Sequence, residues 1–327
     1  MDEIKNALQK QKDENREFRR ELADLNDQFA ALKRAVETDF SILFHTADNF
    51  GYEVCDAKFR ENVWHPHIMS IEDTIDEIVE HKKSIARFGD GEFGIMCGVQ
   101  RWRFQKKDEK LAERLKEVVQ SGNDNILIGL IDFYGNLSSW EKGAANGARI
   151  YLTPEVRRQN YALLDRGRRY ANTSISRNET LENVRNQKRI WEGRDCVFIE
   201  GFQTRMGVGN DLFDNAKSIV RILCPAESAF DRYEEIYNEA LKQPKDRLML
   251  LALGPTASVL AYDLALQGYQ AVDIGHADLS YEVLRRGKSD LSGTVVPNKY
   301  NNEALDGNVV EEIHDTVYES QIIADFH

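Results

Sequence analysis

Two acidic residues, Asp90 and Glu92, stand one residue apart directly after the apolar run Ser84–Phe88. In an extended backbone, side chains two residues apart project to the same side, so this spacing predicts two adjacent carboxylates. Carboxylate oxygens are ligands that Mg²⁺ and Mn²⁺ prefer, and a metal held here would bridge the two phosphates of a nucleotide diphosphate. Arg87 adds a guanidinium for a phosphate contact. These residues leave one alternative open, a tight turn with two solvated acids.

Glycine-containing loops follow two later apolar runs. The run Cys196–Ile199 leads into Gly207–Gly209, and the run Leu248–Leu253 leads into Gly254–Thr256. Free backbone N–H groups in such loops, and the N-terminus of a following helix, favour a bound phosphate. We expect a helix to begin at about Leu212. The first loop lacks the third glycine of the dinucleotide-binding fingerprint, so an ordinary turn is the alternative at both places.

The last apolar run, Ala271–Ile274, opens a segment with three acids and a histidine. His276 is placed to contact a phosphate or a sugar hydroxyl, with a structural histidine as the alternative. Asp278 or Glu282 would serve as a general base that activates an acceptor hydroxyl. These positions predict catalytic chemistry at the end of this run.

A segment of alternating arginines and aromatic residues, Arg101–Gln105, offers Arg103 and Gln105 to a nucleotide. Such residues stack on a base and hold a phosphate. The alternative for this segment is a half-buried edge strand.

The elements that must position these residues are short apolar runs that alternate with helical patterns from Ser70 onward. Strands alternating with helices pair in parallel, which predicts an α/β fold with a Rossmann-like, doubly wound, mostly parallel sheet. Because such sheets bind ligands beyond the carboxyl ends of their strands, the site is expected in the loops that follow the runs. The expected strands are Ser84–Phe88, Ile126–Ile131, Cys196–Ile199, Val220–Leu223, Leu248–Leu253 and Ala271–Ile274.

Residues 1–40 contain neither proline nor glycine and carry an apolar heptad pattern. We predict a parallel coiled-coil helix over 1–40 that makes the protein a homodimer, followed by a linker over 41–65 and one domain over 66–327. A single Asn at an a position favours two strands in register. The alternative is a long amphipathic helix that packs on its own domain. The a positions are Leu8, Asn15, Leu22, Phe29 and Val36.

The net charge, the apolar runs and the cysteine spacing of the chain argue against several classes of protein. The 327 residues carry a formal net charge of −12, which argues against binding of nucleic acid, whose backbone is recognised by clustered Lys and Arg. No secretory leader and no apolar run long enough to span a bilayer are visible, so we expect a cytoplasmic protein. The four cysteines form no zinc or redox spacing, and Cys196 and Cys224 are expected to be buried free thiols.

Three segments together resemble the glycosyltransferases of GT-D fold, including the glucosyltransferases that extend O-glycans on serine-rich-repeat adhesins. They are SIARFGDGEF (84–93), RMGVGNDLFDNAKSIVRILCPAESA (205–229) and LALGPTASVLAYDLALQGYQAVDIGHADLSYE (251–282). The resemblance implies a UDP-sugar donor and a divalent metal at the Asp-x-Glu, with Glu92 as the favoured metal contact. Arg177, in Ser-Ile-Ser-Arg, is similar to the Ser-Arg motif of that family. This chain departs from the motif after Arg177, where Asn-Glu-Thr replaces the expected Pro and aromatic residue. If this loop lines the acceptor side, we expect an acceptor that differs from the adhesin-type substrate.

Together, these observations predict a metal-dependent enzyme that moves a hexose, with glucose favoured, from a UDP-sugar to a hydroxyl of a glycan or glycoprotein. Peripheral association with a membrane glycan-assembly complex would suit the N-terminal arm. One alternative is a non-catalytic nucleotide-sugar-binding subunit of such a complex, and another is a metal-dependent phosphohydrolase. The metal ligands are Asp90 and Glu92, with Mn²⁺ or Mg²⁺ as cofactor, and the catalytic candidates are Asp90, Glu92, His276, Asp278 and Glu282. The donor-binding candidates are Arg87, Gly89, Gly91, Arg103, Gln105, Arg177, Arg205, Gly207, Gly209, Asn210, Asp211, Gly254, Pro255, Thr256, Asp273 and Gly275.

Overall fold

A computed structural model describes the protein over residues 2–53, 66–98, 104–132, 137, 142–151, 153–177, 180–288, 291, 294–301 and 310–327. Within these ranges, nine strands form one sheet in the order β1-β4-β3-β2-β8-β7-β5-β6-β9. Every recorded pairing is parallel, which confirms the predicted α/β class. The strands are β1 (His67–Ile68), β2 (Ser84–Phe88), β3 (Ile126–Leu130), β4 (Arg169–Asn172), β5 (Asp195–Gly201), β6 (Ser218–Cys224), β7 (Leu248–Ala252), β8 (Gln270–Asp273) and β9 (Ile322–Asp325).

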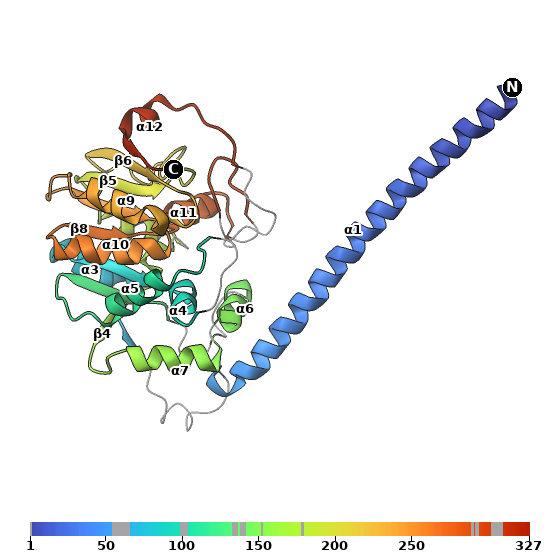
Figure 1. The fold of residues 1–327 in the computed structure, drawn as a ribbon. Coiled ribbons are helices and arrows are strands. Elements are labelled where there is room, and N and C mark those ends of the chain that lie inside the picture. The colour runs from blue at the N-terminus through green and yellow to red at the C-terminus, as the bar shows by residue number, and fades with distance from the viewer. Residues whose placement is uncertain are drawn as a thin grey trace.

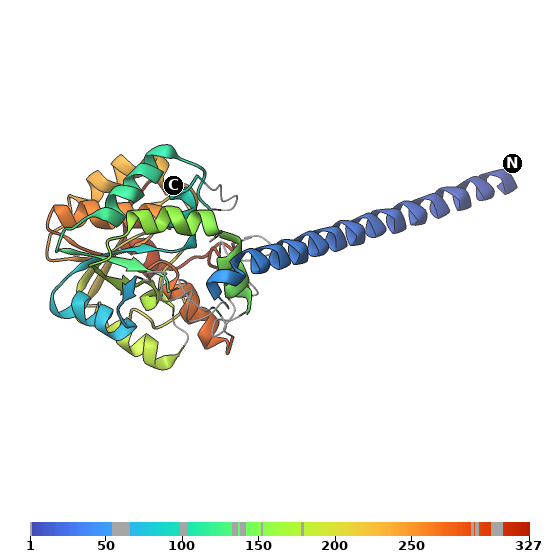
Figure 2. The ribbon, with the colours of Figure 1, turned by 90° about the horizontal axis from the view of Figure 1, so that it is seen from below.

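Helices cover both faces of the sheet, as Figures 1 and 2 show. Helices α5, α9 and α10 contribute to one apolar cluster, and α3, α8 and α11 contribute to the other. The helices are α1 (Asp2–Glu53), α3 (Ile71–Glu80), α4 (Asp90–Met96), α5 (Glu109–Gln120), α6 (Lys142–Tyr151), α7 (Pro154–Leu163), α8 (Leu181–Lys188), α9 (Tyr233–Ala240), α10 (Pro255–Leu266), α11 (Ala277–Arg285) and α12 (Thr316–Gln321), with 3₁₀ turns η1 (Thr173–Ser176) and η2 (Ala229–Arg232). None of the helices in the described ranges is long and apolar enough to cross a membrane.

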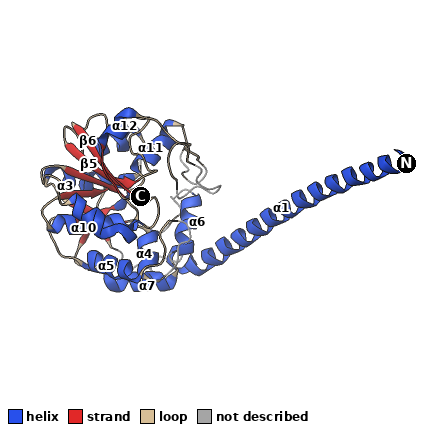
Figure 3. Ribbon diagram, turned by 45° about the horizontal axis from the view of Figure 1, so that its top comes forward, coloured by secondary structure: helices blue, strands red, loops and turns tan. Residues whose placement is uncertain are grey.

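The core consists mainly of two apolar clusters, and alternate side chains of a strand enter one cluster or the other. In β5, Val197 and Ile199 enter one apolar cluster, whereas Cys196 and Phe198 enter the other. Successive side chains of a strand point to opposite faces, so a continuous apolar run is needed where both faces are covered. This requirement is why the six apolar runs could be identified as strands before the fold was known. The strands fan out between the two helical layers in Figure 3.

Three strands were not predicted, namely β1, β4 and β9. Strands β1 and β9 form the two edges of the sheet, and β1 contains only two residues. Strand β4 reads Arg-Tyr-Ala-Asn, in which only Tyr170 and Ala171 are buried. Short or half-polar strands carry little periodic signal, because their conformation depends on the neighbouring strand.

Helix α1 runs without a break to Glu53, beyond the boundary at residue 40 and into the expected linker at 41–65. Residues 41–50 contain no proline or glycine, so nothing in the chain stops the helix there. Residues 54–65 lie outside the described part. The helix extends away from the domain in Figures 1 and 2, and the described side chains of residues 9–40 are almost all exposed. The alternative in which this amphipathic helix packs its apolar heptad positions on its own domain is therefore wrong.

Cys196 and Cys224 are fully buried free thiols, as predicted. Burial raises the pKa of Cys196 to about 12 and also raises the pKa of Cys224. Because the thiolate is the reactive form, we expect neither residue to be alkylated by iodoacetamide in the folded protein at mildly alkaline pH. Mass spectrometry of the treated protein checks this, with protein unfolded in guanidinium chloride as the positive control. Rapid labelling of either thiol in the native state would contradict the prediction.

Candidate active site

The loops that carry the predicted site residues meet at one edge of the sheet. Strands β2, β8, β7 and β5 are neighbours and run parallel, so their carboxyl ends lie together. On one side of β2, the neighbouring strands are β3 and then β4, which follow β2 in the chain. On the other side lie β8, β7, β5 and β6, which come later in the chain. Strands β2 and β8 therefore meet where the strand order changes direction, which is where open α/β sheets bind ligands.

Asp90 and Glu92 lie in the first turn of α4, which begins at Asp90. Residues two apart on a helix are about 200° apart around its axis, so the expectation of an extended segment with both side chains on one side is wrong. The Glu92 carboxylate instead folds back and accepts a hydrogen bond from the N–H of Gly89, with an N–O distance of 2.8 Å. Acidic residues are stabilised in a first helical turn by the helix dipole, which accounts for the local structure.

A third carboxylate, that of Asp273 at the end of β8, lies close enough to influence this pair. Burial is the main cause that raises the pKa of Glu92, and the charges of Asp273 and Asp90 raise it further against the hydrogen bond from Gly89. A cation would relieve the repulsion among these acids. In the described part of the chain, no three His, Cys, Asp or Glu side chains are arranged to hold a metal. A metal held by Asp90 and Glu92 alone would have to take its remaining ligands from phosphate or water.

Arg87, at the end of β2, is held by an ion pair with Asp273 of the neighbouring strand β8, and this junction of the two strand ends is called the β2–β8 seam. One terminal nitrogen donates to Asp273 at 2.9 Å, and the other donates to the hydroxyl of Ser176 and to the carbonyl of Thr173. A Cβ at Gly275 would lie 1.9 Å from the nearer nitrogen, so only glycine leaves room for this guanidinium. Both terminal nitrogens of Arg87 are thus engaged within the protein, and its charge is fixed in place beside the acids.

The turn after β7 is covered by an aromatic ring. Gly254 has a φ of +55°, and a Cβ there would lie 2.1 Å from Cε1 of Phe104. Pro255 begins α10, and the Thr256 hydroxyl and the Gln105 side-chain oxygen are buried without a hydrogen-bond partner. Phe104 therefore lies over the backbone that was expected to face an anion. Arg103 lies outside the described residues.

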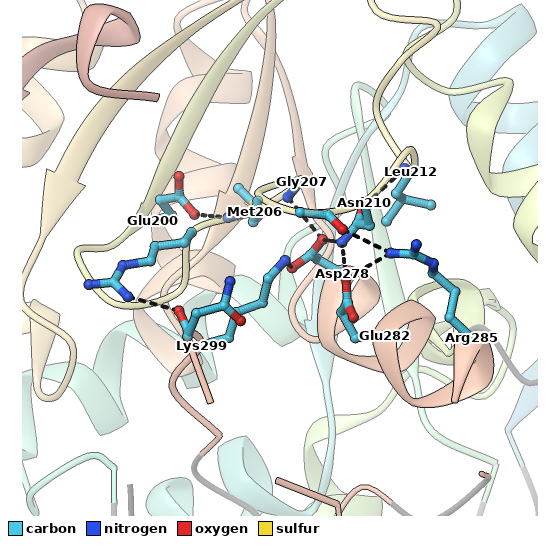
Figure 4. A network of polar contacts seen from close by, with 12 residues as sticks. Glu200, Met206, Gly207, Asn210, Leu212, Asp278, Glu282, Arg285 and Lys299 are labelled. Atoms are coloured by element: carbon cyan, nitrogen blue, oxygen red, sulfur yellow. Dashed lines mark hydrogen bonds and ion pairs between the residues drawn. The ribbon is translucent and has the colours of Figure 1, made fainter. Parts of the chain in front are cut away.

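The Gly207–Asn210 loop is occupied by carboxylates of α11, as Figure 4 shows. The N–H of Gly207 donates to Asp278 at 2.9 Å, and the Asn210 amide donates to Asp278 at 2.8 Å and to Glu282 at 2.7 Å. The N–H group expected to bind phosphate is thus already bonded. No helix begins at Leu212, where the chain makes successive turns. Left-handed glycines and the local bond from Leu212 N–H to the Asn210 side chain account for that error.

Asp278 and Glu282 are both engaged by cations. Buried Asp278 forms an ion pair with buried Lys299, and Glu282 pairs with Arg285 and Arg286. Desolvation alone would raise the pKa of Glu282, but the hydrogen bonds from Arg286 and Asn210 bring its pKa below the ordinary value. This arrangement favours a structural role for both acids over the role of general base expected from the sequence.

Three further candidates in and near this loop also make internal contacts. Arg205, with a φ of +51°, donates to the carbonyls of Asn298 at 2.9 Å and Glu311 at 2.6 Å, and so ties the C-terminal part of the chain to the loop. Asp211 accepts a hydrogen bond from the Tyr281 hydroxyl at 2.7 Å, which lowers the pKa of Asp211. Gly209 accepts from Arg285 through its carbonyl at 2.9 Å.

Two candidates follow the carboxyl ends of strands at this edge of the sheet. His276 is half-buried and stands directly before α11, two residues beyond the end of the run that contains β8. Arg177 follows η1, whose Ser176 contacts Arg87. Like Gly89, Gly91 and Asp273, they lie at or after the carboxyl end of a strand in the same parallel sheet.

Residues 85–304 match the protein family described as glycosyltransferase GT-D fold. The chain belongs to this family. A solved glycosyltransferase from Streptococcus sanguinis aligns with 80% of this chain and 100% of its own length, at 32% identity and a TM-score of 0.73. A second structure, described as a distinct glycosyltransferase fold of domain of unknown function 1792, covers 80% of this chain at a TM-score of 0.72 and 32% identity, over 96% of its own length.

Two curated relatives are 34% identical over 266 residues, or 79% of this chain. They are named probable glycosyl transferase Gly, from Streptococcus gordonii, and glycosyltransferase GlyD, from Streptococcus pneumoniae. The chain spans only 38% and 32% of the lengths of these two relatives. This GT-D chain is therefore similar to one part of each of them.

Several residues that position the candidate site were not predicted from the sequence. Lys299 is a single lysine in a loop, and only its burial beside Asp278 reveals it. Ser176 acts through its contact with Arg87, 89 positions away, so no local pattern marks it. Phe104 belongs to the segment predicted to stack on a base, but its contact with Gly254 was not part of that prediction. Glu200 carried a usable signal, because it directly follows an apolar run and is fully buried in an ion pair with Arg221.

The Lys299–Asp278 pair gives a stability prediction. Replacing Lys299 by Met should lower the free energy of unfolding by about 3–5 kcal/mol, since it leaves the Asp278 charge buried without its cation. Chemical denaturation followed by circular dichroism measures the change. The double variant Lys299→Met with Asp278→Asn should be less destabilised than the single one, because no unpaired charge remains. Unchanged stability of Lys299→Met would contradict the assigned role.

Proposed function

We propose that this GT-D glycosyltransferase uses a divalent metal, Mn²⁺ or Mg²⁺, and moves a hexose, in the first instance glucose, from a UDP-sugar to a hydroxyl of a glycan or glycoprotein. The observation that carries the proposal is the group of carboxylates at the β2–β8 seam, where burial chiefly, and then the charges of Asp273 and Asp90, raise the pKa of Glu92. Asp90 and Glu92 would hold the metal. Once bound, the metal would neutralise charge on the departing diphosphate.

The protein groups around these acids suit an anionic donor. The Arg87 guanidinium is fixed beside them by Asp273 and Ser176, so its positive charge is in place before any ligand arrives. A preorganised charge of this kind stabilises a leaving group without reorganisation. Arg177 and His276 border the same seam and are proposed to contact the diphosphate or the sugar.

Titration calorimetry with UDP, with and without Mn²⁺, tests donor binding. We expect binding that is tighter in the presence of Mn²⁺ and that is weakened in the Glu92→Gln variant. The matched control is Asp124→Asn, an exposed acid that precedes β3 at the opposite end of that strand. The absence of UDP binding under both conditions would overturn the proposal.

A screen of nucleotide sugars that measures UDP release separates the remaining possibilities. Preferential turnover of UDP-glucose supports the proposed donor, and release of inorganic phosphate would favour hydrolysis. UDP binding without turnover of any sugar, in the presence of candidate acceptors, would favour a non-catalytic subunit. As part of the same proposal, the enzyme acts in the cytoplasm as a homodimer held by α1, at the periphery of a glycan-assembly complex.

A further inference from the structure

An apolar stripe runs along the exposed surface of α1. Nine of the fourteen exposed large apolar residues in the described part of the chain lie on this helix. Exposed fractions reach 69% at Phe29 and 71% at Phe40. A contiguous apolar surface of this kind marks an interaction site, because single exposed residues, not continuous stripes, are usual on soluble proteins. The residues are Phe18, Leu22, Leu25, Phe29, Leu32, Val36, Phe40, Leu43 and Phe44.

The described part of the domain does not cover this stripe. A helix of 52 residues is about 78 Å long, and α1 points away from the sheet over most of that length (Figures 1 and 2). In the described part of the chain, α1 contacts the domain at its C-terminal end, against α6. Residues 41, 42, 45 and 46 are half-buried at that end, whereas Leu43 and Phe44 face outward. The stripe therefore continues to the base of the helix and needs a partner from outside.

The charged residues that flank the stripe favour pairing with a second copy of α1 in parallel orientation. With Leu22 and Phe29 at a positions, the g positions include Glu14 and Glu21, whereas the e positions carry Lys5, Lys12, Arg19 and Lys33. In a parallel pair, each g side chain faces an e side chain of the other helix, so Glu14 meets Arg19 of the second copy. In an antiparallel pair, e faces e and g faces g, which places like charges together. A second copy of the same helix in parallel orientation satisfies both the apolar and the charged positions.

We propose that two copies of this chain pair through α1 as a parallel, in-register, two-stranded coiled coil. The a position Asn15 then faces Asn15 of the second copy, an arrangement that fixes register and favours two strands. Both glycosyltransferase domains lie at the same end of the rod, each attached through α6, which in turn packs on α4, the helix that begins with Asp90. This rests on the homodimer of the proposed function and deepens it by assigning the residues that face each other and the charge pairs between the two copies.

Light scattering of the full chain, coupled to size exclusion, tests the pairing. We expect twice the 37.6 kDa of one chain. Leu25→Lys with Leu32→Lys, at two d positions, should give a monomer. The matched control places lysines at two outward positions, Asp27→Lys with Arg34→Lys, and should remain a dimer. A monomeric wild-type chain, a trimer or a larger assembly would overturn the proposal.

Disulfide cross-linking tests the direction. Asn15→Cys should form a cross-linked dimer on mild oxidation, because the two a positions face each other only in the parallel, in-register pair. Arg20→Cys, at an outward position, and the wild-type chain provide the baseline for the native cysteines. A dimer in which Asn15→Cys does not cross-link would overturn the parallel arrangement.

Charge reversal gives an independent readout. Glu14→Lys should raise the dimer dissociation constant by roughly three- to tenfold, and adding Arg19→Glu should restore it, because these residues pair between copies. Failure of the double variant to restore affinity would contradict the pairing. UDP calorimetry on the monomeric Leu25→Lys, Leu32→Lys variant should match the wild type. The outcome for the coiled coil can thus be separated from the outcome for donor binding.

Discussion

Replacing Asp90 by Ala is expected to lower the rate of sugar transfer by roughly 10²- to 10³-fold, the loss that is typical when one group stabilising a departing charge is removed. Asp90 starts α4 at the carboxyl end of β2, and its charge acts on Glu92 together with that of Asp273. We propose that Asp90 holds the metal, so the loss should be in turnover and in metal affinity. Initial rates of UDP release across a Mn²⁺ titration measure both.

The control for this variant must separate chemistry from folding. Asp90 contributes one favourable charge to a first helical turn, which is worth only about 0.3–1 kcal/mol, so thermal unfolding should change little. Asp124→Asn, an exposed acid before β3, should leave the rate unchanged. A fully active Asp90→Ala enzyme with the same dependence on Mn²⁺ would contradict the proposal that Asp90 holds the metal.

Replacing Gly275 by Ala is expected to damage both stability and activity. The new Cβ would lie 1.9 Å from the Arg87 guanidinium, and the φ of +43° is one that side chains with a Cβ rarely adopt. The backbone strain costs about 1–2 kcal/mol, and overpacking adds about 1–3 kcal/mol. Because Arg87 must leave Asp273 and Ser176 to relieve the contact, the charge beside the carboxylates moves as well. Chemical denaturation and UDP-release rates report the two effects.

Gly287 provides the matched control for this prediction. Its φ is +67°, yet a Cβ there meets nothing within 4 Å. Gly287→Ala should therefore show only the backbone strain, about 1–2 kcal/mol, with activity close to wild type. If Gly275→Ala lowered neither the free energy of unfolding nor the rate of UDP release more than Gly287→Ala does, the close approach of Arg87 to Gly275 would matter for neither stability nor activity.

The sequence by itself determined the class of the fold and the region of the site. Runs such as Leu248–Leu253 are apolar at every position because both faces of a parallel strand are buried, and that requirement is visible without a structure. Parallel strands also share one carboxyl edge, so the loops after β2, β7 and β8 could be assigned to one region. The exposed heptad positions of α1 were equally readable, since they depend only on the helical period.

Only the tertiary structure decided which of those residues still have bonding capacity for a ligand. The Gly207 N–H and the Asp278 carboxylate were both candidates, yet they bond to each other across 71 positions of the chain. Arg87 is turned toward Asp273, and Phe104 lies over Gly254, through contacts that join distant segments. Hydrogen-bond donors and acceptors near the ends of strands satisfy one another once the chain is packed. Spacing along the chain shows which groups approach the edge, but their pairing is fixed only when the separate loops are brought together.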